Sequence, residues 1–163
     1  VRLFSFLIDK DQIKVTIDNG TSQYEIKSAS SKEFNLNSIK KPSAPNFEDA
    51  TEKLTDVPLI RVAYGRSGDK GNKANIGIIA RDPKFYPAIC NFLDEKVVKD
   101  CFSNFLEGSV ERYFLPGSNS LNFILNDVLG GGGPASLRND PQGKAYAQIL
   151  LDQTIPIPAK LID

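Results

Sequence analysis

A chain of 163 residues is long enough for one domain with a full hydrophobic core and an appendage. Its 20 basic and 20 acidic residues cancel and leave no clustered positive charge for a phosphate backbone, so we expect no nucleic-acid partner. No stretch approaches the roughly 20 apolar residues of a membrane span, and residues 3–8 lack the features of a signal peptide. We therefore expect no membrane partner and a protein of the cytoplasm or of an organelle matrix.

The absence of histidine removes the commonest general base near neutral pH and the most frequent nitrogen ligand of zinc. Acid–base chemistry here must use Asp, Glu, Lys, Tyr or Cys, and we expect no metal site. The two cysteines, Cys90 and Cys101, lie in an apolar segment with helical spacing, so we expect two buried thiols in a reducing compartment. Methionine is absent even at position 1, and we expect a chain cut from something longer or one that has lost disordered residues.

The first 56 residues are expected to hold a small β-hairpin unit and a linker. Three strands are predicted there, at 1–8, 12–18 and 22–26. Asn19-Gly20, between the last two, is a strong hairpin signal. The hairpin segment is expected over 1–28 and can be the tail of a larger domain. The linker, rich in Ser, Lys, Asn and Pro, is expected over 29–56.

The main domain is predicted over 57–158. Short, branched apolar runs predict three strands, at 59–64, 75–81 and 110–115. Between Phe85 and Leu106 the apolar residues keep helical spacing, which predicts one or two helices. Asp82-Pro83 is suited to start them, and Asp94-Glu95 is a break where a second cap can form.

Two further elements are predicted near the end of the chain. The apolar residues of 121–128 recur as in a short helix, and Gly130 is placed to close it. The apolar run 146–151 is a strand or the end of a helix. The fold class is therefore α+β, with a four-stranded antiparallel or mixed sheet and two to three helices on one face.

The segment from Arg66 to Asn75 is predicted to be a glycine-bearing loop between the first two strands of the main domain. Its glycines let the backbone approach a ligand, and their N–H groups can hold an anion with the help of the basic side chains. The candidate binding residues in this loop are Arg66, Ser67, Gly68, Gly71 and Asn75, with Lys70 as a charged neighbour. The alternative is a solvated hairpin turn.

The run Gly130–Gly133 is the second candidate. Four successive glycines give up side-chain packing and carry a large ordering cost, although one glycine is enough to end a helix. The run therefore indicates flexibility, or a backbone approached by a ligand, by another subunit or by the first loop. Arg138, Asp140 and Lys144 can supply charge to the same cleft. Glu111 is either a catalytic carboxylate or part of an exposed strand face with a cross-strand ion pair.

At these segments the sequence resembles the acyclic terpene utilisation A family, over about 58–158. The matching stretches are Arg66-Ser67-Gly68-Asp69-Lys70-Gly71, Ala74-Asn75-Ile76-Gly77, Val110-Glu111-Arg112-Tyr113, Leu129 with Gly130 to Gly133, Ser136-Leu137-Arg138 and Asp140-Pro141-Gln142-Gly143-Lys144. The family pattern often has Asp at the position of Asn72, which weakens any role for a carboxylate there. The resemblance implies a C-terminal domain of ferredoxin-like fold, usually following a much larger domain.

The predicted order of elements differs from the βαββαβ order of that fold, which points to a mislabelled element, most of all around 135–138, or to a loose fold label. The resemblance also implies a ligand: family members belong to pathways that degrade branched acids, so a coenzyme A thioester or a carboxylate is expected, and no other cofactor.

Two functions are carried forward from the sequence. The first is a domain that completes an acyl-CoA or carboxylate site for a hydratase or lyase step, with Asp69, Lys70 and Glu111 as catalytic candidates and Arg66, Arg138 and the glycine segments as binding groups. The second is an assembly module that packs on a larger N-terminal domain or subunit, within an oligomer. A regulatory small-molecule sensor with its ligand at a sheet edge is a third, weaker alternative.

Overall fold

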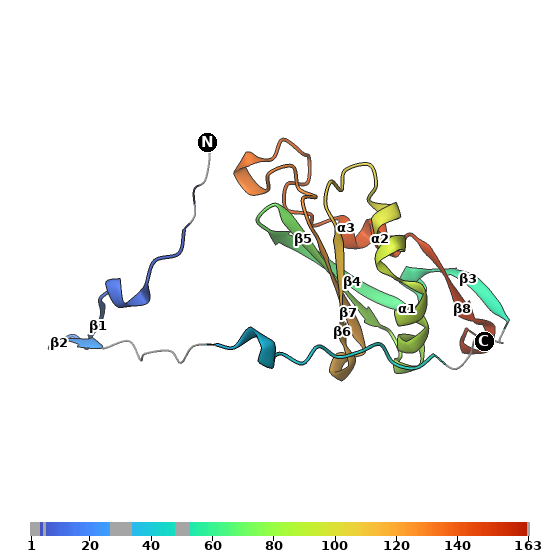
Figure 1. Ribbon diagram of the computed structural model, residues 1–163, viewed down its shortest axis with the longest axis horizontal. Coiled ribbons are helices and arrows are strands. Elements are labelled where there is room, and N and C mark those ends of the chain that lie inside the picture. The colour runs from blue at the N-terminus through green and yellow to red at the C-terminus, as the bar shows by residue number, and fades with distance from the viewer. Residues whose placement is uncertain (1–3, 5, 27–33, 48–52, 163) are drawn as a thin grey trace. The chain divides into compact units, whose positions relative to one another are not determined.

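The computed structural model describes residues 4, 6–26, 34–47 and 53–162 (Figure 1). The chain divides into two units, 2–40 and 41–163, which are described separately. No helix within the described ranges is long and apolar enough to cross a membrane.

The N-terminal unit contains the predicted hairpin. Strands β1 (Val15–Asp18) and β2 (Gln23–Ile26) pair antiparallel. The side chain of Asn19 accepts hydrogen bonds from the N–H groups of Thr21 and Ser22, and Gly20 has a φ of +85° in the same turn. The first strand starts later than predicted, because Lys10–Gln12 form a 3₁₀ turn capped by Asp9. The strand predicted over 1–8 is absent from residues 4 and 6–8, and the rest of it lies outside the described residues.

The second unit is built on a four-stranded sheet in the order β4-β5-β7-β6, with every neighbouring pair antiparallel (Figure 1). Its strands are β4 (Ala63–Lys70), β5 (Lys73–Ala80), β6 (Val110–Leu115) and β7 (Ser120–Leu125). Alternate residues of the two central strands, such as Ile76, Ile78 and Phe123, are fully buried in the core. This architecture confirms the predicted α+β class and its four-stranded sheet.

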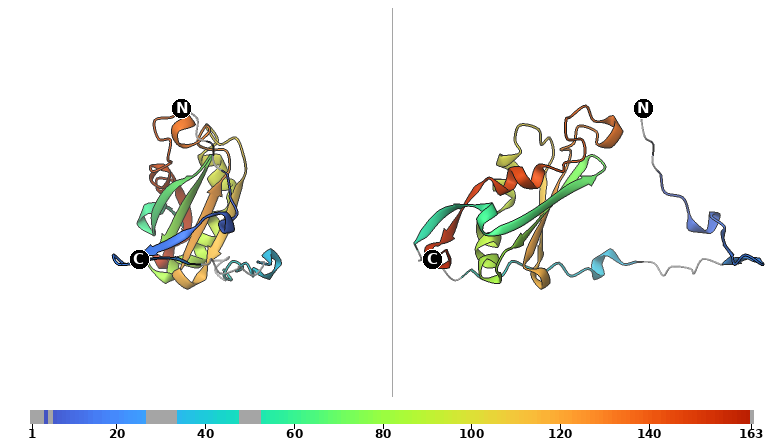
Figure 2. Two further views of the ribbon diagram at one scale, coloured as in Figure 1. Left: turned by 90° about the vertical axis from the view of Figure 1, so that its left-hand side faces the viewer. Right: turned by 180° about the vertical axis from the view of Figure 1, so that it is seen from behind.

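Three short helices cover one face of this sheet and leave the other face open. They are α1 (Tyr86–Phe92), α2 (Glu95–Cys101) and α3 (Tyr146–Leu151), and α3 lies beside β4 (Figure 2). The predicted start and break of the helices are confirmed: Asp82 caps the 3₁₀ turn that leads into α1, and Asp94 accepts a hydrogen bond from the N–H of Val97 at 2.8 Å. Cys90 is buried as predicted, whereas Cys101 is half-buried, and both thiols are free.

The predicted helix over 121–128 is wrong, because this segment forms strand β7. Leu121, Phe123 and Leu125 are fully buried and alternate with more exposed residues, which is the period of a strand. The helical pattern had skipped Phe123. Consequently Gly130 closes no helix. Residues 121–128 were therefore mislabelled, but the corrected order, β4-β5-α1-α2-β6-β7-α3 with β3 before it and β8 after it, still differs from βαββαβ. Residues 136–138, beyond a short 3₁₀ turn at Gly133–Ala135, form no helix or strand.

Both ends of the domain are joined by a separate two-stranded ribbon that was not predicted. Strand β3 (Leu54–Pro58) pairs antiparallel with β8 (Thr154–Pro158), and β3 begins three residues before the expected start of the domain at 57. The strand predicted from Leu59 begins only at Ala63, because Leu59–Arg61 form a 3₁₀ turn. The run at 146–151, left open between strand and helix, is the helix α3.

Candidate functional site

The first candidate segment is not a loop. Residues 66–70 pair with residues 73–77 along β4 and β5, so only Gly71 and Asn72 form the turn, and Gly71 has a φ of +70°. A glycine with positive φ at the first turn position suits a two-residue hairpin. The predicted loop from Arg66 to Asn75 is therefore corrected to two strand ends and a tight turn. Extended strand backbone cannot form the expected anion nest, because a nest needs successive N–H groups on one side of the chain and those of a strand point alternately to its two edges.

Strand geometry instead divides these residues between the two faces of the sheet. Side chains alternate along β4, so Arg66, Gly68 and Lys70 lie on the open face, whereas Ser67 and Asp69 face the helices. The buried hydroxyl of Ser67 donates to the carbonyl of Lys144 at 3.1 Å and accepts from the N–H of Ala147 at 2.9 Å. Ser67 thus anchors the segment that leads into α3, and its side chain is structural.

On the open face, a cavity of about 320 Å³ lies over β4 and β5. We call it the cationic pocket; its lining residues are Arg66, Ser67, Gly68, Lys70, Asn75, Gly77 and Lys144. A Cβ atom placed on Gly68 would lie 3.3 Å from the Nζ of Lys144, so that amino group reaches over the strand from its edge. None of the described residues that line it is acidic.

The three basic side chains of the cationic pocket have no acidic partner within the described part of the chain. Lys70 donates only to neutral acceptors, the carbonyl of Asp69 at 2.9 Å and the Oδ1 of Asn75 at 3.3 Å. The amide of Asn75 in turn donates to the Oδ1 of Asn122 at 3.2 Å. The pocket therefore holds uncompensated positive charge above a floor of two glycines.

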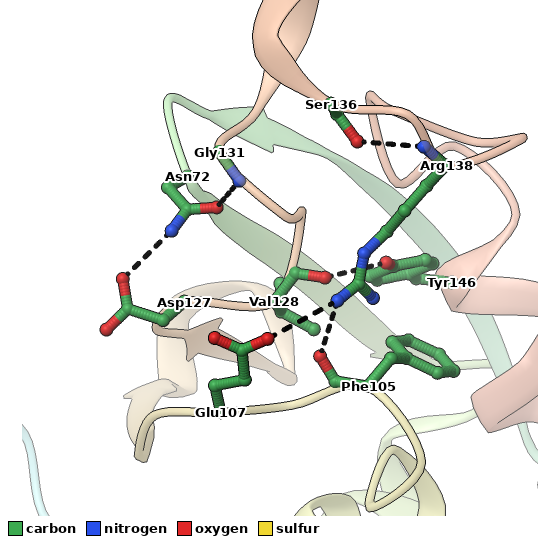
Figure 3. A network of polar contacts seen from close by, with 9 residues as sticks. All are labelled: Asn72, Phe105, Glu107, Asp127, Val128, Gly131, Ser136, Arg138 and Tyr146. Atoms are coloured by element: carbon green, nitrogen blue, oxygen red, sulfur yellow. Dashed lines mark hydrogen bonds and ion pairs between the residues drawn. The ribbon is translucent and has the colours of Figure 1, made fainter.

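The glycine run packs against the tip of the β4–β5 hairpin, which was one of the predicted alternatives (Figure 3). All four glycines have positive φ, and a Cβ on Gly132 would overlap the carbonyl oxygen of Gly71. The N–H of Gly131 donates to the Oδ1 of Asn72 at 2.7 Å, and the amide of Asn72 donates to Asp127 at 3.0 Å. Glycine is needed at position 132 because two backbones meet there, and the run does not line the cationic pocket.

Arg138 lies beside the glycine run, where a Cβ on Gly130 would come 2.8 Å from its Nε, but it does not line the cationic pocket (Figure 3). It donates to the carbonyl of Phe105 at 3.1 Å and lies 4.0 Å from a carboxylate oxygen of Glu107. A second cavity of about 620 Å³ surrounds it; the lining residues are Asn104, Phe105, Leu137, Arg138, Asn139, Asp140 and Tyr146. A shared cleft for Arg66 and Arg138 is therefore not what the structure shows, whereas Lys144 does reach the cationic pocket.

Asp140 positions Lys144 without entering the cationic pocket. Its carboxylate accepts from the backbone N–H groups of Lys144 at 3.0 Å and Ala145 at 2.8 Å. These two bonds fix the turn that carries Lys144, and the bond from Ser67 to the Lys144 carbonyl ties the same turn to β4. The lysine is thus held at the strand edge from two sides.

Glu111 lies on the open face but far from the cations. In the register of the sheet, β5 and β7 separate it from Gly68, a distance of about 14 Å at the usual strand spacing. Tyr113 donates to its carboxylate at 2.6 Å and Asn126 at 2.9 Å, and these bonds hold the pKa of Glu111 below its ordinary value. A general acid at neutral pH needs the opposite shift.

Arg112 does not form the cross-strand ion pair considered for Glu111. It pairs with Glu95 at 3.2 Å and donates to the carbonyl groups of Cys90 and Leu93, on the helix side of the sheet. Neither carboxylate candidate shares the pocket with the cations: Glu111 lies on the far side of the open face, and the Asp69 side chain faces the helices. Among the described residues there is also no cluster of three or more metal-binding side chains.

Two functional positions escaped the sequence reasoning. Gly77, in the middle of β5, forms part of the pocket floor, and an isolated glycine inside a strand pattern is a signal for close approach that could have indicated it. Asn72 links the hairpin tip to the glycine run through both ends of its amide. Its place in a two-residue turn after Gly71 was the available signal.

One comparison with known proteins gives a match. A family model described as the AtuA ferredoxin-like domain matches residues 57–156. No curated protein and no solved structure matches the chain.

Proposed function

This chain belongs to the AtuA ferredoxin-like domain family, and from that premise we propose that its domain completes an acyl-CoA or carboxylate binding site in the breakdown of branched acyl-CoA compounds. The cationic pocket holds an anionic group of the ligand. A larger domain or subunit supplies the reacting groups of a hydratase or lyase step.

The observation that carries this proposal is the uncompensated charge of the cationic pocket. Arg66, Lys70 and Lys144 converge on one cavity without an acidic neighbour among its lining residues. A cluster of positive charges destabilises the free fold by mutual repulsion, and its field attracts anionic ligands that relieve this repulsion when they bind. Two strand glycines, Gly68 and Gly77, keep the floor free for that ligand.

The distance of the two carboxylates from the cationic pocket supports a role in binding for this domain, with the reacting groups supplied by a larger domain or subunit. Asp69 faces the helices, and Glu111 is hydrogen-bonded at the far side of the sheet with a lowered pKa. A proton-transferring group must lie within hydrogen-bond reach of the reacting atom. The pocket therefore binds and orients its ligand, and the candidate roles of Asp69 and Glu111 in proton transfer lose their support.

The test is a thermal-shift titration of the chain with coenzyme A, branched acyl-CoA thioesters and branched carboxylates. A ligand at a hundredfold excess over its Kd stabilises the folded state by about 2.7 kcal/mol. Arg66→Ala and Lys144→Ala should abolish most of that shift, because each removes a cation from the pocket. Lys99→Ala, at an exposed site on α2, removes the same charge elsewhere and should leave the shift intact.

Gly77→Val separates the shape of the pocket from its charge. A Cβ at Gly77 meets only the Arg66 carbonyl, at 3.8 Å, which is an ordinary contact, and valine suits a strand; the substitution adds volume at the floor and keeps all three cations. The variant should fold and fail to bind. Binding that survives both Gly77→Val and Arg66→Ala would place the ligand elsewhere.

The assembly module remains the second candidate, because one observation favours it. Tyr64, Ile79 and Leu115 follow one row across the open face, and their exposed fractions are 56%, 48% and 45%. Exposed apolar side chains in a row are typical of a protein contact. If this row mediates assembly, Ile79→Lys should lower the mass of the assembly measured by light scattering. Adding anions should not change that mass.

A further inference from the structure

We infer that the cationic pocket recognises a phosphate dianion and not a carboxylate. This inference rests on the proposed function and narrows it. If the ligand is a coenzyme A compound, the pocket holds one of its phosphate groups, and the thioester lies outside the pocket.

The charge of the pocket favours a dianion. Among the residues that the structure describes, three cationic side chains line it and no carboxylate does. A carboxylate brings one negative charge, whereas a phosphate monoester carries about 1.5 to 2 at pH 7. The mutual repulsion of Arg66, Lys70 and Lys144 is therefore relieved much further by a phosphate.

The directions of the donors also suit phosphate. Arg66 and Lys70 stand on the open face at equal spacing on either side of Gly68, and the Lys144 amino group comes over Gly68 from the edge of the strand. Three donors thus line one pocket. A phosphate monoester presents three terminal oxygens, one for each donor, whereas a carboxylate presents two.

Asn75 orients the pocket and does not compete for the anion. Its Oδ1 accepts from the Nζ of Lys70 at 3.3 Å, and its Nδ2 donates to Asn122 at 3.2 Å. Both ends of the amide are therefore used. These hydrogen bonds to neutral amide groups hold Lys70 over the floor of the pocket without neutralising its charge.

The size of the pocket sets which part of a ligand it takes. Its volume of about 320 Å³ is at the lower end of small-molecule sites. A head group fits there, and the remainder of a large ligand must extend beyond it. Since the Asp69 side chain lies on the other face of the sheet and Glu111 lies three strands away, no proton transfer is expected at the pocket itself.

The test compares three small anions: glycerol 3-phosphate, sulfate and acetate. Binding is measured by the NMR shifts of the amide groups of Gly68 and Gly77, which form the floor of the pocket. At pH 7.5 we expect phosphate and sulfate to bind at least tenfold more tightly than acetate. The second ionisation of a phosphate monoester lies near pH 6, so its affinity should fall about fourfold between pH 7.5 and 5.5. Sulfate stays a dianion, and its affinity should not change.

The matched variants are Lys144→Gln and Lys99→Gln. The first should weaken phosphate and sulfate far more than acetate, and the second should change nothing. Acetate binding as tightly as phosphate would overturn the dianion inference and leave the proposed anion site standing. Coenzyme A binding without any phosphate-induced shift at Gly68 or Gly77 would overturn it too. If neither coenzyme A nor any anion bound, the proposed function would fall as well.

Discussion

Replacing Gly132 by alanine tests the contact between the glycine run and the hairpin tip. Gly132 has φ +72° and ψ 153°, a conformation almost restricted to glycine, which costs other residues about 1–3 kcal/mol. Its new Cβ would also overlap the Gly71 carbonyl, so the tip must move away. That movement breaks the bond from the Gly131 N–H to Asn72, at roughly 1 kcal/mol. We expect a loss of about 3 kcal/mol.

The assay is urea unfolding followed by circular dichroism, with the unfolding slope as a check on two-state behaviour. Gly133→Ala is the matched control: φ at Gly133 is +46°, and an added Cβ meets nothing within 4 Å. Only the left-handed backbone is penalised there, by about 1–2 kcal/mol. Equal losses in the two variants would refute the contact. The folded Gly132→Ala variant should still bind anions, because the run lies outside the cationic pocket.

Three further predictions concern single contacts. Asn72→Asp places a carboxylate against Asp127 and should lower the free energy of unfolding by about 1–2 kcal/mol at pH 7. Because repulsion raises the folded-state pKa of this carboxylate pair, the loss of stability should shrink as the pH falls through about 4, and a loss that does not change with pH would contradict this account. Tyr113→Phe removes the largest cause of the lowered pKa of Glu111, which should rise toward its ordinary value in a ¹³C NMR titration; an unchanged pKa would assign the shift to other groups. Burial raises the pKa of Cys90 to about 11, so its alkylation at pH 8 should proceed only through unfolding, and labelling at the rate of a free thiol would disprove the burial.

Much of the fold was predictable because local patterns coincided with the final structure. The caps at Asp82 and Asp94 mark the helices, and β6 has the predicted bounds 110–115. The segment 121–128 failed because its spacing satisfies two periods. Residues 121, 124, 125 and 128 are all apolar and fit a helix, and only the apolar Phe123 favours a strand. The segment becomes a strand because it pairs with β5 and β6, which are contacts that local spacing does not reveal.

The candidate site was predicted in composition but not in arrangement. Arg66, Lys70 and Asn75 do share a pocket, but no local sequence pattern indicates how far the pairing of β4 with β5 continues toward the turn. Once the strands continue to Lys70, the pleat alone moves Asp69 to the opposite face. Lys144 is held at the pocket by hydrogen bonds of its backbone with Ser67 and Asp140. Ser67 and Lys144 are 77 residues apart in the chain, so no local sequence pattern indicates their contact.

The ribbon of β3 and β8 has a consequence for how the domain can be connected to other chains. Because Leu54 pairs with Pro158, the polypeptide enters and leaves the domain at the same corner. Domains with adjacent ends tolerate insertion into a host loop and circular permutation. A permuted chain whose original ends are joined across the ribbon, and which is opened at the exposed turn at Gly117, should keep the sheet and the cationic pocket.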